Sequence, residues 1–353
     1  MAYILLLIWM LFCYMFVWSN KRLGNEQREK TYYVLFFLGC TFLMGFRSEK
    51  VGVDTERYKQ LFEMMQNVSF KEMISETIYN RRIGYMALMK AVGFLDGNYY
   101  TFQFLISVIF NYNVYKFISN NTRDPFLASS VFLGCGLYLS AMNVQRETFA
   151  VVLLLRAWDL VNEKKQFKAL IISIFAVSCH TTALICILAY VIYLLKDNKL
   201  FLKVAPIVVL LGALNYQRLI GFFSTYFVSY SNYYKNKKTL TEAGGVTIIW
   251  GVILILSFYC IYNKKKFSNI ERVYGIFCII CVITDILGMY FNYLDRLGTY
   301  FILFEILLID SIANHFDESS FRKVYKFGVS FSFLAYFLLS ALTSVQYQYT
   351  SFV

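Results

Sequence analysis

The run ALIISIFAVSCHTTALICILAYVIYLL (residues 169–195) is the stretch that decides the fold class. It is longer than the roughly 20 apolar residues that cross a bilayer as a helix. Its middle carries the one side chain that can gain a positive charge, His180. Lysines cluster on both sides of it, at 164–168 and at 196–203. By the positive-inside rule, both ends should therefore face the cytoplasm.

A single span cannot have both of its ends on one side. Ser178, Thr181 and Thr182 flank the histidine, and Ser and Thr favour helix ends over helix interiors. The pattern therefore predicts two short helices that rise and return, with His180 at the turn. Broken helices occur in membranes where the freed backbone lines a cavity. The alternative is that residues 83–95 cross the membrane fully and reverse every span between them and Lys196.

The rest of the chain has the composition of a membrane protein. Of 353 residues, 58% are hydrophobic and 16% are charged, whereas soluble domains carry about 25% charged residues. The net charge of +12 would suggest nucleic acid in a soluble chain. Here the basic residues form short stretches between apolar runs, as in cytoplasmic loops. This composition argues against a soluble enzyme and against a nucleic-acid partner.

Apolar runs that can span the membrane occur at 2–19, 31–46, 99–118, 125–143, 144–161, 169–195, 204–222, 246–262, 273–290, 297–313 and 328–347. We therefore predict an all-α polytopic integral membrane protein with about 10–12 transmembrane helices, one broken or re-entrant near His180. Residues 1–353 should form a single multi-spanning domain, in which 83–95 is a half-span or an interfacial helix. The first run has the pattern of an uncleaved span rather than a signal peptide.

Three basic connections orient these spans. Residues 20–30, 263–272 and 314–326 carry clustered Lys and Arg and should be cytoplasmic. The long segments 47–82 and 223–245 then become loops on the outer face.

Charged residues inside a membrane are functional candidates, because burying them costs free energy. Arg146 and Glu147 open the span 144–161, directly after the corner at 141–143, and should face the outer side. An arginine at a helix N-terminus can bind an anion there. The alternative is an interfacial ion pair whose side chains reach to water.

His180 is equally open to two interpretations, a packed side chain or a polar group in a cavity. A metal site is not expected, since no HExxH or CxxH spacing occurs. The eight cysteines lie in apolar runs and do not form a disulfide framework. Cys278 and Cys281 spell CxxC, for which apolar packing is the expected role.

The predicted outer segments supply further candidates for substrate binding. Mixed charge in a solvated loop explains the first of these segments equally well, and a membrane-interface belt explains the tyrosines of the second. Tyrosine rings also stack on the apolar faces of sugars. The candidates are Arg47, Asp54, Tyr58, Arg82 and Tyr85 in the first, Arg218, Tyr230 and Tyr233 around the second, and Arg296 and Tyr300 at the outer end of a late span.

No P-loop, GxGxxG or GxSxG motif appears, which excludes a nucleotide-using cytoplasmic domain of those types. The motifs that do occur are Gly45-Phe46-Arg47, Val51-Gly52-Val53-Asp54-Thr55-x-x-Tyr58, Gly84-Tyr85, Met142-Asn143-x-x-Arg146, His180-Thr181-Thr182-Ala183 and Asp295-Arg296. In this order, from about residue 40 to 301, they resemble the EpsG-like, Wzy-type polysaccharide polymerases. The chain departs from the family pattern at Glu147, where Gln is usual, and at Arg82-Ile83, where an acidic residue and Pro are usual. It also has Thr182 where the family has Ser.

The resemblance implies a polymerase that joins undecaprenyl-diphosphate-linked oligosaccharide repeat units into capsule, exopolysaccharide or O-antigen chains. The reaction would take place at the outer face of the bacterial cytoplasmic membrane, without metal or cofactor. Its partners would be the lipid-linked glycan, membrane lipid, a chain-length regulator and a flippase. Arginines would bind the diphosphate, with Arg47, Arg146 and Arg296 converging on it. His180, Glu147 or Asp54 would serve as base or oriented acceptor.

Three other functions compete with this one. A lipid-linked oligosaccharide transporter or flippase would show internal repeats and midplane charges, neither of which stands out. A transferase resembling the O-antigen ligases would share the donor but use another acceptor. A membrane acyltransferase would also use an intramembrane histidine, but no site for acyl-CoA is evident on the cytoplasmic side.

Overall fold

The computed structural model describes residues 1–75, 82–216, 218, 244–289 and 294–352. These residues are helical and contain no strand beyond one isolated β-bridge. The chain divides into two compact units, Met1–Leu184 with Phe327–Val353, and Ile185–Lys326. The protein is thus an all-helical membrane protein, as the composition predicts.

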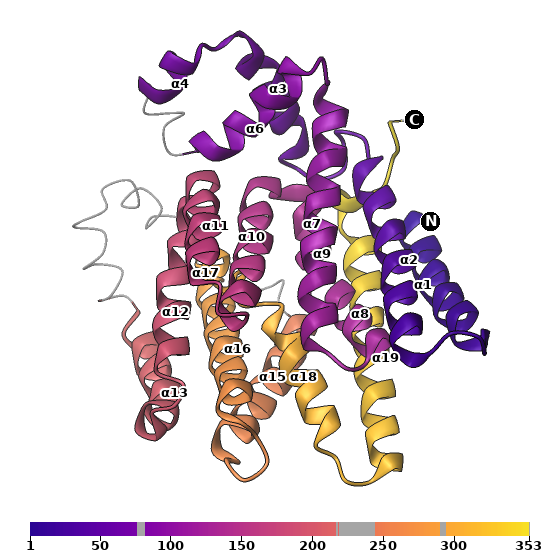
Figure 1. Cartoon of the computed structure of the whole chain (residues 1–353), viewed down its shortest axis with the longest axis vertical. Helices are drawn as coiled ribbons and strands as arrows, with labels where there is room; N and C mark the ends of the chain where they lie inside the picture. The colour runs from indigo at the N-terminus through magenta and orange to yellow at the C-terminus, as the bar shows by residue number, and fades with distance from the viewer. Residues whose placement is uncertain (76–81, 217, 219–243, 290–293, 353) are drawn as a thin grey trace. The chain divides into compact units, whose positions relative to one another are not determined.

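The helices of the first unit are α1 (Ala2–Ser19), α2 (Asn25–Gly45), α3 (Thr55–Asn67), α4 (Phe70–Ser75), α6 (Ile83–Phe94), α7 (Tyr99–Asn121), α8 (Pro125–Gly134), α9 (Leu137–Asn143), α10 (Gln145–Asn162) and α11 (Gln166–Cys179) (Figure 1). The 3₁₀ helix η1 (Thr181–Ile185) leads into the second unit, whose helices are α12 (Cys186–Leu194), α13 (Lys199–Leu214), α15 (Gly244–Tyr262), α16 (Asn269–Gly288), α17 (Asp295–Gly298) and α18 (Phe304–Asn314). Helix α19 (Ser319–Thr343) returns the chain to the first unit, where the 3₁₀ helix η4 (Val345–Tyr347) follows.

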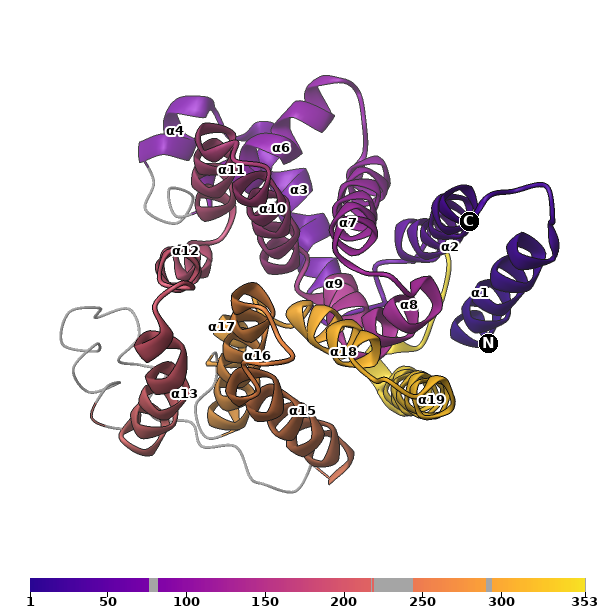
Figure 2. The same cartoon turned by 60° about the horizontal axis from the view of Figure 1, so that its bottom comes forward.

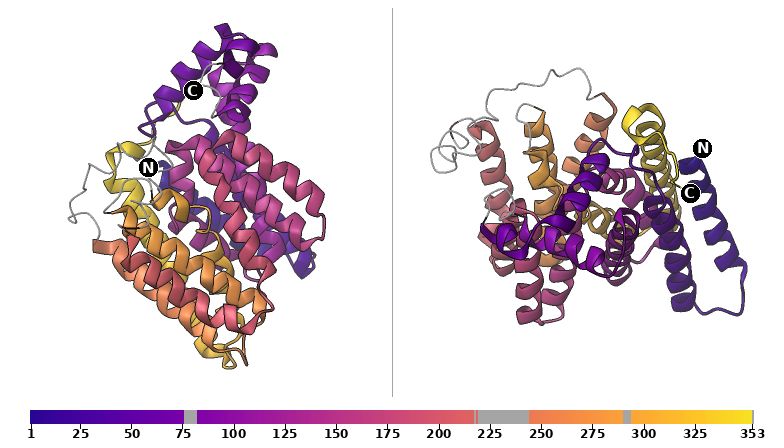
Figure 3. Two further views of the ribbon diagram at one scale, coloured as in Figure 1. Left: turned by 90° about the vertical axis from the view of Figure 1, so that its left-hand side faces the viewer. Right: turned by 90° about the horizontal axis from the view of Figure 1, so that it is seen from above.

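Helices α1 and α2 form a hairpin at the edge of the first unit (Figures 1 and 3). The indole of Trp9 donates a hydrogen bond to the Leu35 carbonyl at 2.9 Å. Gly39 lies against the same ring, since a Cβ there would come within 2.4 Å of it. Large apolar side chains of α1 remain exposed along its length. A helix that is apolar on all sides is typical of a membrane span.

Within the part of the chain that the structure describes, two helices, α1 and α19, are long and apolar enough to cross a membrane. A third span results if α8 and α9, bent by 45°, count as one. Some other helices of similar length carry too many charged residues to qualify. Helix α16, for example, contains Glu271, Arg272 and Asp285. The predicted 10–12 spans therefore stay a prediction.

The predicted spans 125–143 and 297–313 are not continuous helices. Residues 125–143 form α8 and α9, which separate at Gly136, where φ is +89°. Glycine adopts this left-handed conformation without a steric penalty. Residues 297–313 begin in α17, which ends at Gly298, and the helix resumes only at Phe304.

The interruption predicted at His180 is confirmed. Helix α11 ends at Cys179, His180 is extended with φ −150° and ψ 122°, and a 3₁₀ turn precedes α12. The boundary between the two units falls in the same turn, after Leu184. Whether both lysine clusters lie on one side of the membrane stays a prediction.

The predicted outer loop 47–82 is largely helical where the structure describes it. Helices α3, α4 and α6 lie over the ends of α7, α10 and α11 (Figures 1 and 2). Residues 83–94 thus pack as part of this layer, against α3, α7 and α11. Gly84 permits the contact with α11, because a Cβ there would lie 2.1 Å from Ser178 Oγ.

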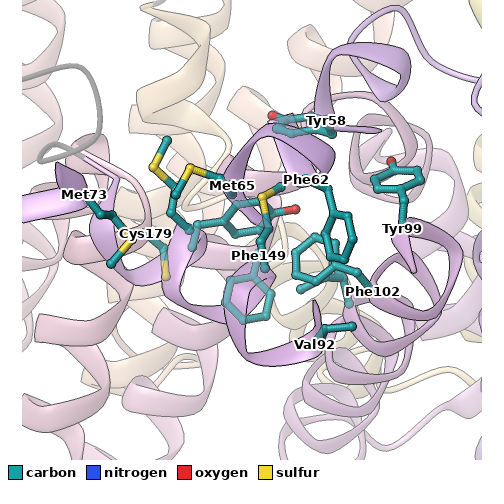
Figure 4. Close-up of a cluster of buried hydrophobic side chains, with 13 residues drawn as sticks. Tyr58, Phe62, Met65, Met73, Val92, Tyr99, Phe102, Phe149 and Cys179 are labelled. Carbon is teal, nitrogen blue, oxygen red and sulfur yellow. The ribbon is translucent and has the colours of Figure 1, made fainter. Parts of the chain in front are cut away.

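A buried apolar cluster holds this layer in place (Figure 4). Helix α3 contributes Tyr58, Phe62 and Met65, which recur on one helical face, and Phe102 and Phe149 come from α7 and α10. Burying an aliphatic or aromatic side chain of this size contributes roughly 1.5–3 kcal/mol. The layer is thus firmly attached to the helix ends that carry the predicted site residues.

Candidate functional site

Two motifs far apart in sequence form one structure at the end of α9. Thr55 Oγ1 donates hydrogen bonds to the carbonyls of Val51 at 2.6 Å and Met142 at 2.9 Å. The backbone N–H of Asp54 donates to Asn143 Oδ1 at 2.9 Å. Gly52 has φ +90°, and a Cβ there would lie 2.3 Å from the Met142 carbonyl oxygen. The glycine is therefore required both by its backbone conformation and by this contact.

A buried chain of polar side chains extends from this corner. Tyr85 OH donates to Gln145 Oε1 at 3.2 Å, and Gln145 Nε2 donates to Tyr99 OH at 3.1 Å. Tyr99 OH in turn donates to the Thr55 carbonyl at 3.3 Å. These bonds join α6, α7 and the start of α10 to the start of α3. Sequence reasoning missed Gln145 and Tyr99, although Gln145 directly precedes the predicted Arg146.

His180 and Glu147 face each other in the same region. His180 Nε2 lies 3.9 Å from Glu147 Oε2, and His180 Nδ1 lies 2.5 Å from Thr182 Oγ1. Glu147 is 3% exposed and His180 is 7% exposed. A buried carboxylate is costly unless a neighbouring charge or hydrogen bond compensates for it. This arrangement suits a base. If the His180 imidazole takes up a proton, the nearby Glu147 carboxylate stabilises the cation that forms.

Arg146 and Tyr58 stand beside this pair. Tyr58 is buried, and its ring centroid lies 6.0 Å from that of Tyr85. Arg146 is half-buried, and among the described residues no carboxylate lies within ion-pair distance of its side chain. Asp54 is more exposed and pairs with Arg57 at 3.4 Å.

Arg47 is the most deeply buried of the predicted arginines, at 1% exposure. Its Nη1 donates to the Met44 carbonyl, and its own backbone carbonyl accepts a hydrogen bond from Gln103 Nε2 at 2.7 Å. Within the described part of the chain, no carboxylate lies within ion-pair distance of it. The segment that begins at Arg47 is bound through Asp54 and Thr55 to the corner just before Arg146. Buried charges are normally paired, which makes Arg47 a candidate for binding an anion.

A partly buried carboxylate, that of Glu49, lies in the loop that carries Arg47. Tyr100 OH donates a hydrogen bond to Glu49 Oε2, and Lys59 Nζ lies 3.4 Å from Glu49 Oε1. The hydrogen bond from Tyr100 is the main reason that the pKa of the Glu49 carboxyl lies below its usual value. Glu49 therefore stays ionised at neutral pH and holds the loop to the start of α7.

The other predicted residues lie just before α6, in the second unit, or outside the described residues. Arg82 is exposed at the start of α6. Arg218, Arg296 and Tyr300 belong to the second unit, where Arg218 is exposed and Tyr300 is buried. The convergence of Arg296 with Arg47 and Arg146 thus stays a prediction. Tyr230 and Tyr233 lie outside the described residues.

The cysteines and acidic residues show no metal-binding arrangement in the part of the chain that the structure describes. The eight cysteines are free thiols. Cys278 and Cys281 are both fully buried in α16, in agreement with an apolar packing role.

Comparison with known proteins gives one match. The sequence model described as the EpsG family matches residues 30–352. No curated protein and no solved structure matches the chain. The matched range contains all the residues of the cluster around His180, Glu147 and the two arginines.

Proposed function

The chain belongs to the EpsG family, and from this membership we propose that it joins oligosaccharide repeat units carried on undecaprenyl diphosphate into a longer glycan. Family membership and the helical fold make it a membrane protein with a polymerase-like role in polysaccharide biosynthesis. The donor, the outer-face reaction and the metal-independent chemistry belong to our proposal.

The observation that carries the proposal is the buried cluster of the first unit. A base candidate, His180, faces an acid, Glu147, at 3.9 Å. Arg146 directly precedes Glu147, and the segment that begins at Arg47 is hydrogen-bonded to Met142 and Asn143, just before Arg146. One base and two cations without acidic partners among the described residues are what transfer from a diphosphate carrier requires.

Each step of the transfer has a residue suited to it. The acceptor hydroxyl oxygen forms a bond with the anomeric carbon of the donor sugar, and His180 takes the hydroxyl proton. The bond between that carbon and the diphosphate oxygen breaks, and the diphosphate leaves with both bonding electrons. Arg47 and Arg146 neutralise the charge that develops on it, since guanidinium groups bind phosphate oxygens through two parallel hydrogen bonds.

The presence of an apolar groove supports the proposal that the substrate is linked to a lipid. It has a volume of about 350 Å³ and runs between α1 and α2. Its lining consists of Ala2, Leu5, Leu6, Trp9, Gly39, Phe42, Leu43, Phe46 and Tyr349. Phe46 directly precedes Arg47, so a polyprenyl chain in this groove would bring its diphosphate towards the buried arginine.

The outer-face assignment is tested by cysteine labelling in a background without native cysteines. Lys165→Cys and Asn198→Cys should both be protected from an impermeant reagent added outside. Gln60→Cys should be labelled, as should Lys237→Cys, which lies outside the described residues. Labelling at position 165 but not at 198 would show an unbroken span and a reversed orientation for part of the chain.

The reaction itself is tested in a strain that lacks this chain but retains the rest of its polysaccharide pathway. Such cells should accumulate single lipid-linked repeat units on the outer side, and the wild-type chain should restore a ladder of polymer. A flippase would instead leave single units on the cytoplasmic side when deleted. A ligase would leave full-length polymer on its lipid carrier. Either result would refute the polymerase.

A further inference from the structure

The last residues of the chain return to the loop that carries Arg47. Ser48 N–H donates to the Thr350 carbonyl at 2.7 Å, and Phe352 N–H donates to the Phe46 carbonyl at 3.2 Å. These two bonds enclose Arg47 and Ser351 in an antiparallel bridge. A third bond runs from Gly52 N–H to the Gln346 carbonyl at 2.8 Å.

Side chains strengthen the same contact. Ser48 Oγ and Thr350 Oγ1 lie 2.5 Å apart. Tyr349 OH donates to the Leu43 carbonyl at 3.1 Å, at the end of α2. The ring of Phe352 stacks on Tyr100 with centroids 4.1 Å apart. Residues 344–352, which we name the C-terminal strap, thus contact the loop 46–52 on both sides of Arg47.

The loop depends on these contacts, because it belongs to no helix. Unpaired backbone N–H and C=O groups are costly when buried, and the strap pairs with those of Phe46, Ser48 and Gly52. Gln103 Nε2 holds the remaining carbonyls, of Gly45 and Arg47, at 2.9 and 2.7 Å. The backbone of Arg47 is therefore held from two sides, by α7 and by the strap.

Ordering a segment that lies largely outside the helices costs conformational entropy, which its contacts must offset. The strap's contacts concentrate on the loop with the buried arginine and on the start of the motif 51–55. We propose that the C-terminal strap is a positioning element that sets the guanidinium of Arg47 for the diphosphate of the substrate. This inference rests on the proposed role of Arg47 in the transfer reaction.

The first test removes one backbone hydrogen bond. Phe352→Pro eliminates the N–H that bonds to the Phe46 carbonyl, whereas Phe352→Ala keeps it and removes only the stacked ring. A hydrogen bond of this kind is worth about 1 kcal/mol, so polymerisation should be about fivefold slower with Pro than with Ala. Equal rates would overturn the positioning role of the strap.

The second test asks whether the strap acts through Arg47. Lysine lacks the planar guanidinium group that has to be oriented. In an Arg47→Lys background, Phe352→Pro should therefore reduce the polymerisation rate little more than Phe352→Ala does. Residues that act as a unit show such non-additive effects. If Phe352→Pro reduces the polymerisation rate by the same factor in both backgrounds, the strap supports only the fold, and the inference fails.

The third test reads the contact without any polymerisation assay. Ser48→Cys and Thr350→Cys together, in a background without the eight native cysteines, should form a disulfide in membranes, seen as a mobility shift on reducing and non-reducing gels. The cross-linked chain should remain active, since the strap stays in place during turnover. Absence of the cross-link, or its formation with loss of activity, would overturn the inference. Cross-linking in a chain that proves not to be a polymerase would refute the proposed function while leaving the strap contact intact.

Discussion

The buried pair of His180 and Glu147 allows the sharpest test of the proposed chemistry. When the imidazole takes the proton of the acceptor hydroxyl, it becomes a cation 3.9 Å from the Glu147 carboxylate. At an effective dielectric constant of about 20, two unit charges at that distance attract each other by about 4 kcal/mol. This corresponds to about a 10³-fold effect on rate. Glu147→Gln keeps the size of the side chain but removes its charge, so it should slow polymerisation by about that factor.

The assay measures the initial rate at which membranes containing each variant extend lipid-linked repeat units, normalised to the amount of inserted protein. Asp159→Asn is the matched control. Asp159 is a buried carboxylate further along the same helix, hydrogen-bonded to Asn121 at 2.9 Å and separate from the His180 cluster. Its replacement should leave the rate within a few-fold of wild type.

A double-mutant cycle with His180→Gln decides whether the carboxylate acts through the histidine. His180→Gln should itself cost about 10²–10⁴-fold, the usual range for a general base. Adding Glu147→Gln to the His180→Gln variant should then cause no further loss of the polymerisation rate. A fully active Glu147→Gln would refute the argument and show that an amide, usual at this position in the related pattern, is sufficient. Independent, multiplicative losses would show that the two residues serve separate purposes.

Three further predictions follow from the described contacts. Arg47→Lys should slow polymerisation at least tenfold, because the planar fork is lost, whereas the exposed Arg57→Lys should have no effect in the same rate assay. Gly84→Ala should destabilise the protein by about 1–3 kcal/mol, measured as a lower unfolding temperature in detergent, since the added Cβ would meet Ser178. Gly328→Ala should not lower the unfolding temperature, because a Cβ added at Gly328, on α19, would lie in open space. Because the pKa of Glu49 is lowered in the folded state, its stabilisation is present above a pH of about 4.5 and lost as the pH falls through its folded pKa. Glu49→Gln should therefore reduce the drop in unfolding temperature between pH 6 and pH 3, and an unchanged drop would show that Glu49 contributes nothing.

The helical class and the break at His180 could be predicted because they depend on local sequence. Long apolar runs with few prolines form helices, and the Ser and Thr residues around His180 favour a helix end. The boundaries were less predictable. The separation of α8 and α9 depends on the left-handed backbone of Gly136, and a single glycine in an apolar run does not reveal its conformation.

The candidate site was predictable in its residues but not in its geometry. Arg146, Glu147 and His180 were identifiable as polar groups in apolar surroundings. That Glu147 faces His180 depends on how α10 packs against α11, which no local pattern encodes. Gln145 and Tyr99 are hydrogen-bonded only through tertiary contacts. The C-terminal strap pairs through backbone atoms with a loop about 300 residues away, and backbone pairing leaves no signature in residue identity.

The structure also separates two kinds of residue within the short motifs. Gly52 and Gly84 both lie where another element approaches too closely for a Cβ, at 2.3 Å and 2.1 Å respectively. Thr55 and Asn143 use their side chains to join the loop to the corner after α9. These residues bring the motifs together without needing to touch a substrate. The proposed chemistry involves a different set of groups, namely Arg47, with no acidic partner among the described residues, and the acid–imidazole pair. A stability assay should therefore respond mainly to the glycines, and a rate assay mainly to the charged side chains.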